Sequence, residues 1–117
     1  MGIDALGFVL GTATAFVAQK GFVPIRKAGR LPGPSHSISF TDYTGRDKSL
    51  EVGENAIRPG ARALLVDDWI ETGAQAKAAV ELVESQDGIV VGICAIHIDS
   101  NPQTAWLREH YKCHAVS

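Results

Sequence analysis

Hydrophobic positions along the chain fall into strand-like runs that alternate with helix-like segments. Runs rich in valine, isoleucine and leucine at 63–66 and 88–98 predict buried strands of a parallel sheet. Apolar positions at helical spacing predict amphipathic helices at 75–83 and 104–110. The remaining short elements are a helix at 12–19 and strands at 22–26 and 112–116. Strands that alternate with helices predict an α/β fold, a mainly parallel sheet flanked by helices.

Glycine and proline divide the first half of the chain. Residues 1–4 resemble the tail of a strand, and a glycine-bounded turn is expected at 6–11. The run Leu31-Pro32-Gly33-Pro34 excludes regular structure at that point. Beyond it, the loosely alternating segments 35–43 and 49–52 predict a hairpin or a flexible flap.

Size and composition describe an ordinary globular protein. The chain has 117 residues, enough for one domain at 1–117, and is 45% hydrophobic and 21% charged. A net charge of −2 gives no basic surface for nucleic acid, and no apolar stretch is long enough to span a membrane. Cys94 and Cys113 lack zinc or redox spacing, which predicts reduced core thiols in a cytoplasmic protein.

The most informative stretch is ALLVDDWIETGAQA, residues 63–76. Its apolar run ends in Asp67 and Asp68, and a Thr-Gly turn then opens a helix. Neighbouring carboxylates can accept the two hydroxyls of a ribose, and the N–H groups of a turn at a helix N-terminus can hold a phosphate. Ligands of open parallel sheets lie beyond the carboxyl ends of the strands, where this turn must be. The pattern predicts a sugar-phosphate site; its alternative is a buried strand followed by acids that cap the next helix.

Three other charged residues are predicted at the carboxyl ends of strands. Asp4, Lys27 and Asp99 each follow a predicted strand, as the acid pair does. Because parallel strands end at one edge of a sheet, all of these side chains should converge there. Asp99 fits equally well as a residue that merely closes its strand.

Residues 63–76 resemble the phosphoribosyl-diphosphate signature of type I phosphoribosyltransferases. The segment GIDALGF at 2–8 is similar to the pyrophosphate loop of the adenine-specific members, and VPIRKAGRLPGP at 23–34 resembles their Arg-Lys-x-Gly-Lys-Leu-Pro-Gly stretch. The resemblance covers essentially the whole chain. It implies an adenine phosphoribosyltransferase of purine salvage. Such a transferase uses Mg²⁺ to transfer the phosphoribosyl group of phosphoribosyl diphosphate to a purine base, and the products are AMP and pyrophosphate.

The resemblance also implies roles for individual residues. Asp67 and Asp68 would hold the ribose hydroxyls, directly or through an indirectly bound Mg²⁺. The 5′-phosphate would be gripped by Glu71, Thr72, Gly73, Ala74 and Gln75. These assignments predict a site that binds a sugar phosphate, with carboxylates at the ribose and backbone N–H groups at the phosphate.

Other motif residues would face the pyrophosphate and the base. Lys27 and Arg30 would neutralise the pyrophosphate beside the loop that contains Leu6 and Gly7, while Asp42 would handle the proton of the base. The flap would close over the site to exclude water. Simpler interpretations are a solvated basic turn for the two cations and a turn residue for Asp42.

The sequence departs from the family pattern in three places. Leu6 stands where adenine-specific members have arginine, and an apolar side chain cannot donate to pyrophosphate. Ala74 and Gln75 replace a glycine and a small hydroxyl residue, so we expect strain at Ala74 if the turn needs a positive φ. The chain begins near the end of the family's first core strand and lacks the hood that encloses the purine. A fragment, a misplaced start codon or a shortened protein would each explain this departure.

Two classes of function follow. If the sheet lacks a strand, an exposed edge is expected, and a homodimer would cover it. Either the domain is an enzyme, or it is a regulatory module that binds phosphoribosyl diphosphate or a nucleotide without catalysis, as the missing arginine and hood suggest. Formation of AMP would indicate the enzyme, and binding of phosphoribosyl diphosphate without turnover would indicate the regulatory module.

Overall fold

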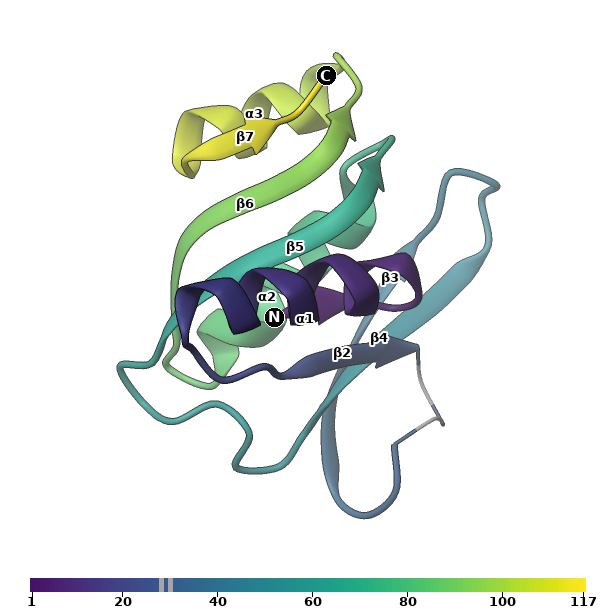
Figure 1. The fold of residues 1–117 in the computed structure, drawn as a ribbon. Coiled ribbons are helices and arrows are strands. Elements are labelled where there is room, and N and C mark those ends of the chain that lie inside the picture. The colour runs from purple at the N-terminus through teal and green to yellow at the C-terminus, as the bar shows by residue number, and fades with distance from the viewer. Residues whose placement is uncertain (28, 30) are drawn as a thin grey trace.

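A seven-stranded sheet and three helices make up the part of the chain that the computed structural model describes, residues 1–27, 29 and 31–117 (Figure 1). The elements in chain order are β1 Gly2–Ile3, α1 Leu6–Ala18, β2 Pro24–Lys27, β3 Ser35–Thr41, β4 Asp47–Gly53, β5 Arg62–Ile70, α2 Ala74–Ser85, β6 Ile89–Ile98, α3 Pro102–His110 and β7 Cys113–Ala115. The strand order across the sheet is β3-β4-β2-β1-β5-β6-β7.

The sheet combines a parallel core with an antiparallel hairpin. Strands β2, β1, β5, β6 and β7 run parallel, while β4 pairs antiparallel with both β2 and β3. The predicted α/β architecture with a mainly parallel sheet is therefore confirmed, and the predicted hairpin extends that sheet beyond β2. The expected unpaired edge at the chain start is wrong, because β1 lies between β2 and β5.

Helices cover both faces of the sheet. Helix α1 packs over β1 and β5 on one face, whereas α2 lies across β3 to β6 on the other (Figure 1). Helix α3 joins the α2 side, where the Lys77 ammonium group lies 4.9 Å from the centre of the Trp106 ring. The main core fills the space between the sheet and α2, with Ile3, Leu50 and Val83 each at most 1% exposed.

Helix α1 begins at Leu6, so the predicted turn at 6–11 is wrong. The glycines that suggested a turn are packing residues. A Cβ atom on Gly7 would lie 2.8 Å from the Val66 carbonyl oxygen, and one on Gly11 would lie 2.8 Å from the Phe22 ring. Because glycine lets two backbones approach closely, Gly7 and Gly11, four residues apart, let the helix lie directly on the sheet.

Candidate active site

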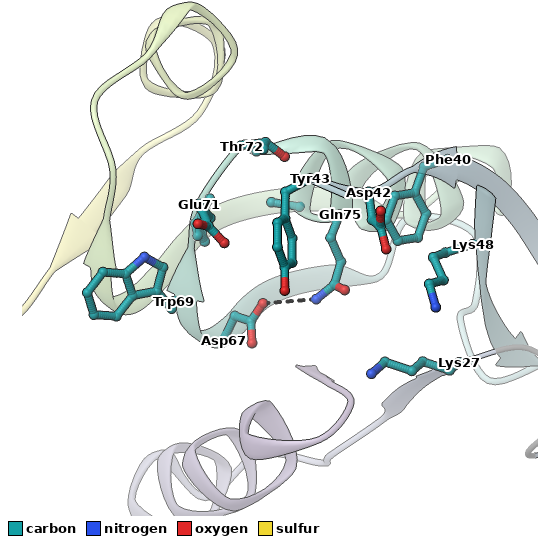
Figure 2. A pocket seen from close by; sticks show the side chains of 13 residues that line it. Lys27, Phe40, Asp42, Tyr43, Lys48, Asp67, Trp69, Glu71, Thr72 and Gln75 are labelled. Atoms are coloured by element: carbon teal, nitrogen blue, oxygen red, sulfur yellow. Dashed lines mark hydrogen bonds between the residues drawn. The ribbon is translucent and has the colours of Figure 1, made fainter. Parts of the chain in front are cut away.

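A cavity of about 320 Å³ opens at the edge of the sheet where the parallel strands end (Figure 2). Its walls come from the end of β2, the β3–β4 hairpin, the end of β5 and the first turn of α2. The predicted convergence of charged strand ends is found in part, because Asp99 is not among the residues that line the cavity. Lys27 and Asp67 line the cavity, and Asp4 accepts a hydrogen bond from the Lys27 backbone N–H at 3.3 Å.

Asp67 is the buried acid of the site. It lies within β5, which continues to Ile70, so the strand does not end at the acid pair as expected. One carboxylate oxygen accepts from the Asp68 N–H at 2.9 Å, and the other accepts from the Gln75 amide at 3.2 Å. Burial, reinforced by the neighbouring Asp68 carboxyl group, raises the pKa of Asp67 to about 7. Asp67 therefore exchanges its proton close to neutral pH.

The two neighbouring acids do not share one environment. The two carboxyl groups lie close enough for the Asp68 side chain to raise the pKa of Asp67, yet they differ in burial. Asp67 is 5% exposed and lines the cavity, whereas Asp68 is half-buried and outside the cavity lining. The structure thus brings only the first acid of the predicted pair to the cavity.

The turn before α2 has its positive φ at Gly73, not at Ala74. Gly73 has φ of 89°, a conformation that favours glycine, and Ala74 begins the helix without strain. The expected strain at Ala74 is therefore wrong. The Thr72 hydroxyl accepts a hydrogen bond from the Ala74 N–H at 3.2 Å. The Gly73 cap leaves the first turn of α2 open to an anion.

Residues at the start of helix α3 contact the turn that precedes α2. The Asn101 side-chain amide donates to the Glu71 carbonyl oxygen at 2.7 Å, and Asn101 also caps α3 through the Thr104 N–H at 3.0 Å. Thr104 and Leu107 pack near Gly73. The contacts fix the loop from a segment about thirty residues away, which no local sequence signal indicates.

A buried glutamate holds the loop that follows Lys27. Glu51 on β4 is 6% exposed, and its carboxylate accepts backbone N–H groups of Gly29 at 3.1 Å and Leu31 at 2.7 Å. Charge-assisted bonds of this kind are the stronger class of hydrogen bond. The hairpin therefore supports the loop next to the cavity, a role that the sequence analysis missed.

Asp42 lines the cavity and also organises the hairpin turn. One of its carboxylate oxygens accepts hydrogen bonds from the Thr44 N–H and hydroxyl groups and from the Arg46 N–H. The hydrogen bond from the Thr44 hydroxyl is the main cause that lowers the pKa of Asp42, and Lys48 makes a smaller contribution. The contacts confirm Asp42 as a turn residue that also lines the cavity, and its role with the proton of the base stays a prediction. The neighbouring Tyr43 projects its hydroxyl group toward Asp67 and Gln75 (Figure 2).

An exposed indole forms the far wall. Trp69 is 54% exposed and lines the cavity, yet its orientation is fixed. Its Nε1–H donates to Asp99 at 3.1 Å, and its ring centre lies 4.5 Å from that of His97, the residue that pairs with it across β5 and β6. His97 Nε2 also lies 3.0 Å from the same Asp99 oxygen. Asp99 thus has a structural role beyond closing its strand.

The predicted site residues divide into three groups. Those that line the cavity are Lys27, Asp42, Asp67, Glu71, Thr72, Gly73 and Gln75. Asp68, Ala74, Leu6 and Gly7 do not line it, and Arg30 lies outside the described residues. The lining residues to which the sequence analysis assigns no role are Phe40, Tyr43, Lys48, Trp69, Ile70 and Ala76.

Comparison with known proteins gives clear relatives. An adenine phosphoribosyltransferase of Methylobacterium nodulans is 46% identical over 95 residues, which are 81% of this chain and 52% of the relative. An adenine phosphoribosyltransferase structure from Thermoanaerobacter pseudethanolicus matches with a TM-score of 0.89 at 33% identity, covering 98% of this chain and 66% of that one. The chain belongs to the type I phosphoribosyltransferase family.

A structure of the Saccharomyces cerevisiae adenine phosphoribosyltransferase, complexed with D-2,5-dideoxy-2,5-imino-altritol 1,6-bisphosphate and adenine, matches with a TM-score of 0.88 at 30% identity. That match covers 99% of this chain and 65% of the yeast chain. No protein-family model matches the sequence. The chain spans about half the length of the curated relatives it matches, and the phosphoribosyltransferase fold extends through nearly all of it.

The remaining site expectations concern metals, thiols and membranes. Among the described residues, no three His, Cys, Asp or Glu side chains form a group that could hold a metal ion. Cys94 and Cys113 are unpaired and half-buried rather than deep in the core, and burial raises the pKa of both thiols. No helix in the described part of the chain is long and apolar enough to cross a membrane.

Proposed function

We propose that this domain transfers the phosphoribosyl group of phosphoribosyl diphosphate to adenine, with AMP and pyrophosphate as products. The observation that carries the proposal is one cavity that joins a buried acid, an open helix N-terminus, a lysine and an indole. These four features match the four parts of the substrates: ribose, 5′-phosphate, diphosphate and base. The yeast relative was crystallised with adenine and a bisphosphate, which supports this substrate class.

Under this proposal each wall of the cavity has a defined role. Asp67 accepts a hydroxyl of the ribose, and the N–H groups around Gly73 bind the 5′-phosphate, with Thr72 as an added donor. Lys27 neutralises the leaving diphosphate, and Trp69 stacks on the planar base. Glycosidic-bond exchange builds positive charge on the ribose ring and negative charge on the leaving group, so charges fixed in advance lower the barrier.

The acid residues fit a magnesium ion that arrives with its substrate. Mg²⁺ prefers oxygen ligands and commonly binds through one or two carboxylates plus substrate phosphates and water. Asp67 and Asp68 would hold it through water or the ribose hydroxyls. The ion would supply additional positive charge for the diphosphate.

A second candidate is binding without catalysis. Leu6, at the start of α1, is 59% exposed and outside the cavity lining. A side chain there that cannot donate a hydrogen bond favours a domain that senses phosphoribosyl diphosphate or a nucleotide without turnover.

The deciding experiment incubates the protein with adenine, phosphoribosyl diphosphate and Mg²⁺ and quantifies AMP by chromatography. Asp67→Asn combined with Asp68→Asn should abolish AMP formation, while circular dichroism checks that this variant is folded. No AMP from folded wild-type protein rejects the transferase. Calorimetric binding of phosphoribosyl diphosphate in the same sample would then favour the sensor.

We also propose that the domain forms a homodimer through α1. The helix is apolar around most of its circumference, and Val9, Phe16 and Val17 are 67%, 84% and 82% exposed. Contiguous exposed apolar surface of this kind marks interaction sites.

We further propose that the protein is located in the cytoplasm, because thiols such as Cys94 and Cys113 stay reduced there.

A further inference from the structure

The cavity contains a second cation that the proposed roles leave unused. Lys27 on β2 and Lys48 on β4 are the only cationic side chains among the described residues that line it. Figure 2 shows both ammonium groups at the same end of the cavity, away from Trp69. We propose that Lys48 is a second binding group for the diphosphate of the phosphoribosyl donor, acting together with Lys27. This proposal rests on the proposed function.

Strand pairing places the two lysines as neighbours. Lys27 pairs directly with Leu50 across the antiparallel β2–β4 ladder, and Lys48 lies two residues from Leu50 on the same strand. Residues two apart on a strand share a face, and such diagonal partners lie roughly 7–8 Å apart, within reach of long side chains. Both lysines therefore extend from one face of the sheet toward one volume, and a diphosphate can bridge them.

Two like charges in this position repel each other unless an anion lies between them. No described acid lies within 4.0 Å of either ammonium group, although Asp42 is near enough to Lys48 for the lysine to lower the pKa of that carboxyl slightly. An anionic ligand explains the pair better than solvation alone.

The reaction needs the second cation. The leaving diphosphate develops negative charge in the transition state, and preorganised cations stabilise that charge. Leu6 at the start of α1 offers none, and its side chain is 59% exposed. Lys48 supplies the missing charge from the hairpin that forms one wall of the cavity.

The test compares Lys48→Gln with Arg46→Gln. Arg46 is an exposed cation of the same hairpin and does not line the cavity, so its variant controls for net charge and for hairpin folding. Calorimetry with Mg²⁺ measures pyrophosphate and, separately, ribose 5-phosphate. We expect Lys48→Gln to weaken pyrophosphate binding about tenfold and ribose 5-phosphate less than about twofold, with Lys48→Arg restoring most of the loss. Arg46→Gln should change neither affinity.

Each other outcome has a definite meaning. Pyrophosphate affinity that is unchanged in Lys48→Gln, or weakened equally in Arg46→Gln, overturns the role of Lys48. If the wild-type protein binds ribose 5-phosphate but not pyrophosphate, the role of Lys48 fails and the sugar-phosphate site stands. Binding of neither ligand by folded protein rejects the proposed function itself, and the inference with it.

Discussion

Replacing the buried acid Asp67 by asparagine should change how the stability of the fold depends on pH. In the folded protein the pKa of Asp67 is raised from 3.8 to about 7 by burial, with a further contribution from Asp68. The unfolded chain releases this proton near pH 4, whereas the folded chain retains it up to about pH 7. The folded state therefore binds one more proton in this window, and its stability falls as the pH rises.

The size of the effect follows from the pKa difference. The gap between 3.8 and about 7 corresponds to about 4 kcal/mol, at roughly 1.4 kcal/mol per pKa unit. Asparagine has the same shape and no charge to bury, and the Gln75 amide can rotate to offer its oxygen to the new NH₂ group. Asp67→Asn should thus match the wild type near pH 4 and exceed its unfolding free energy by up to about 4 kcal/mol at pH 8.

Urea unfolding followed by circular dichroism, at half-unit steps from pH 4 to pH 8.5 with EDTA present, measures this difference. Subtracting the two profiles cancels every titration that the variant leaves unchanged. Asp68→Asn provides a second check, because it removes a carboxyl group that raises the pKa of Asp67, and its own stability should fall less steeply with pH. A difference profile that is flat or rises with pH would show that Asp67 ionises normally in the folded state.

Three further predictions test other parts of the site. In a Trp106→Phe background, AMP should quench the fluorescence of Trp69, and Trp69→Leu should weaken AMP binding by about 1–3 kcal/mol while ribose 5-phosphate binding stays unchanged; equal losses for both ligands would contradict base stacking. Gly73→Ala should lower the unfolding free energy by about 1–3 kcal/mol and weaken ribose 5-phosphate binding, since φ is 89° there; unchanged urea midpoints would disprove strain. Phe16→Glu should halve the mass found by sedimentation at micromolar concentration, and a wild-type monomer would reject the α1 interface.

The sequence predicted those parts of the site that are encoded locally. Apolar residues before Asp67 and the Thr72-Gly73 turn after it lie within one strand–turn–helix unit, so their order alone places the acid and the turn at one sheet edge. The local sequence pattern gave a wrong prediction at the start of α1, where a turn was expected at 6–11. Gly7 and Gly11 indicate a turn when read as isolated residues, and only the close contact with β1 and β5 explains them.

The remaining parts depend on strand pairing, which single-sequence patterns do not specify. Lys48 and Lys27 become neighbours only through the β2–β4 register, and Trp69 meets His97 only through the β5–β6 register. Asn101 reaches the Glu71 carbonyl oxygen before α2 across a similar distance in sequence. A pattern search finds each residue but not its partner, so these roles could be assigned only once the register was known.

The order of chemical groups along the cavity constrains how a substrate must lie in it. Trp69 stands at one end, Asp67 in the middle, and Lys27 and Lys48 at the other end (Figure 2). Under the proposed function, the base, the ribose and the diphosphate follow the same order, so the bond that forms and the bond that breaks lie on opposite sides of the ribose held by Asp67. Attack from the indole end and departure toward the lysines then place the reacting atoms nearly in line, which a displacement at the anomeric carbon requires. A base bound at the lysine end would face two ammonium groups without any anion between them, so the charge layout itself selects one direction of binding.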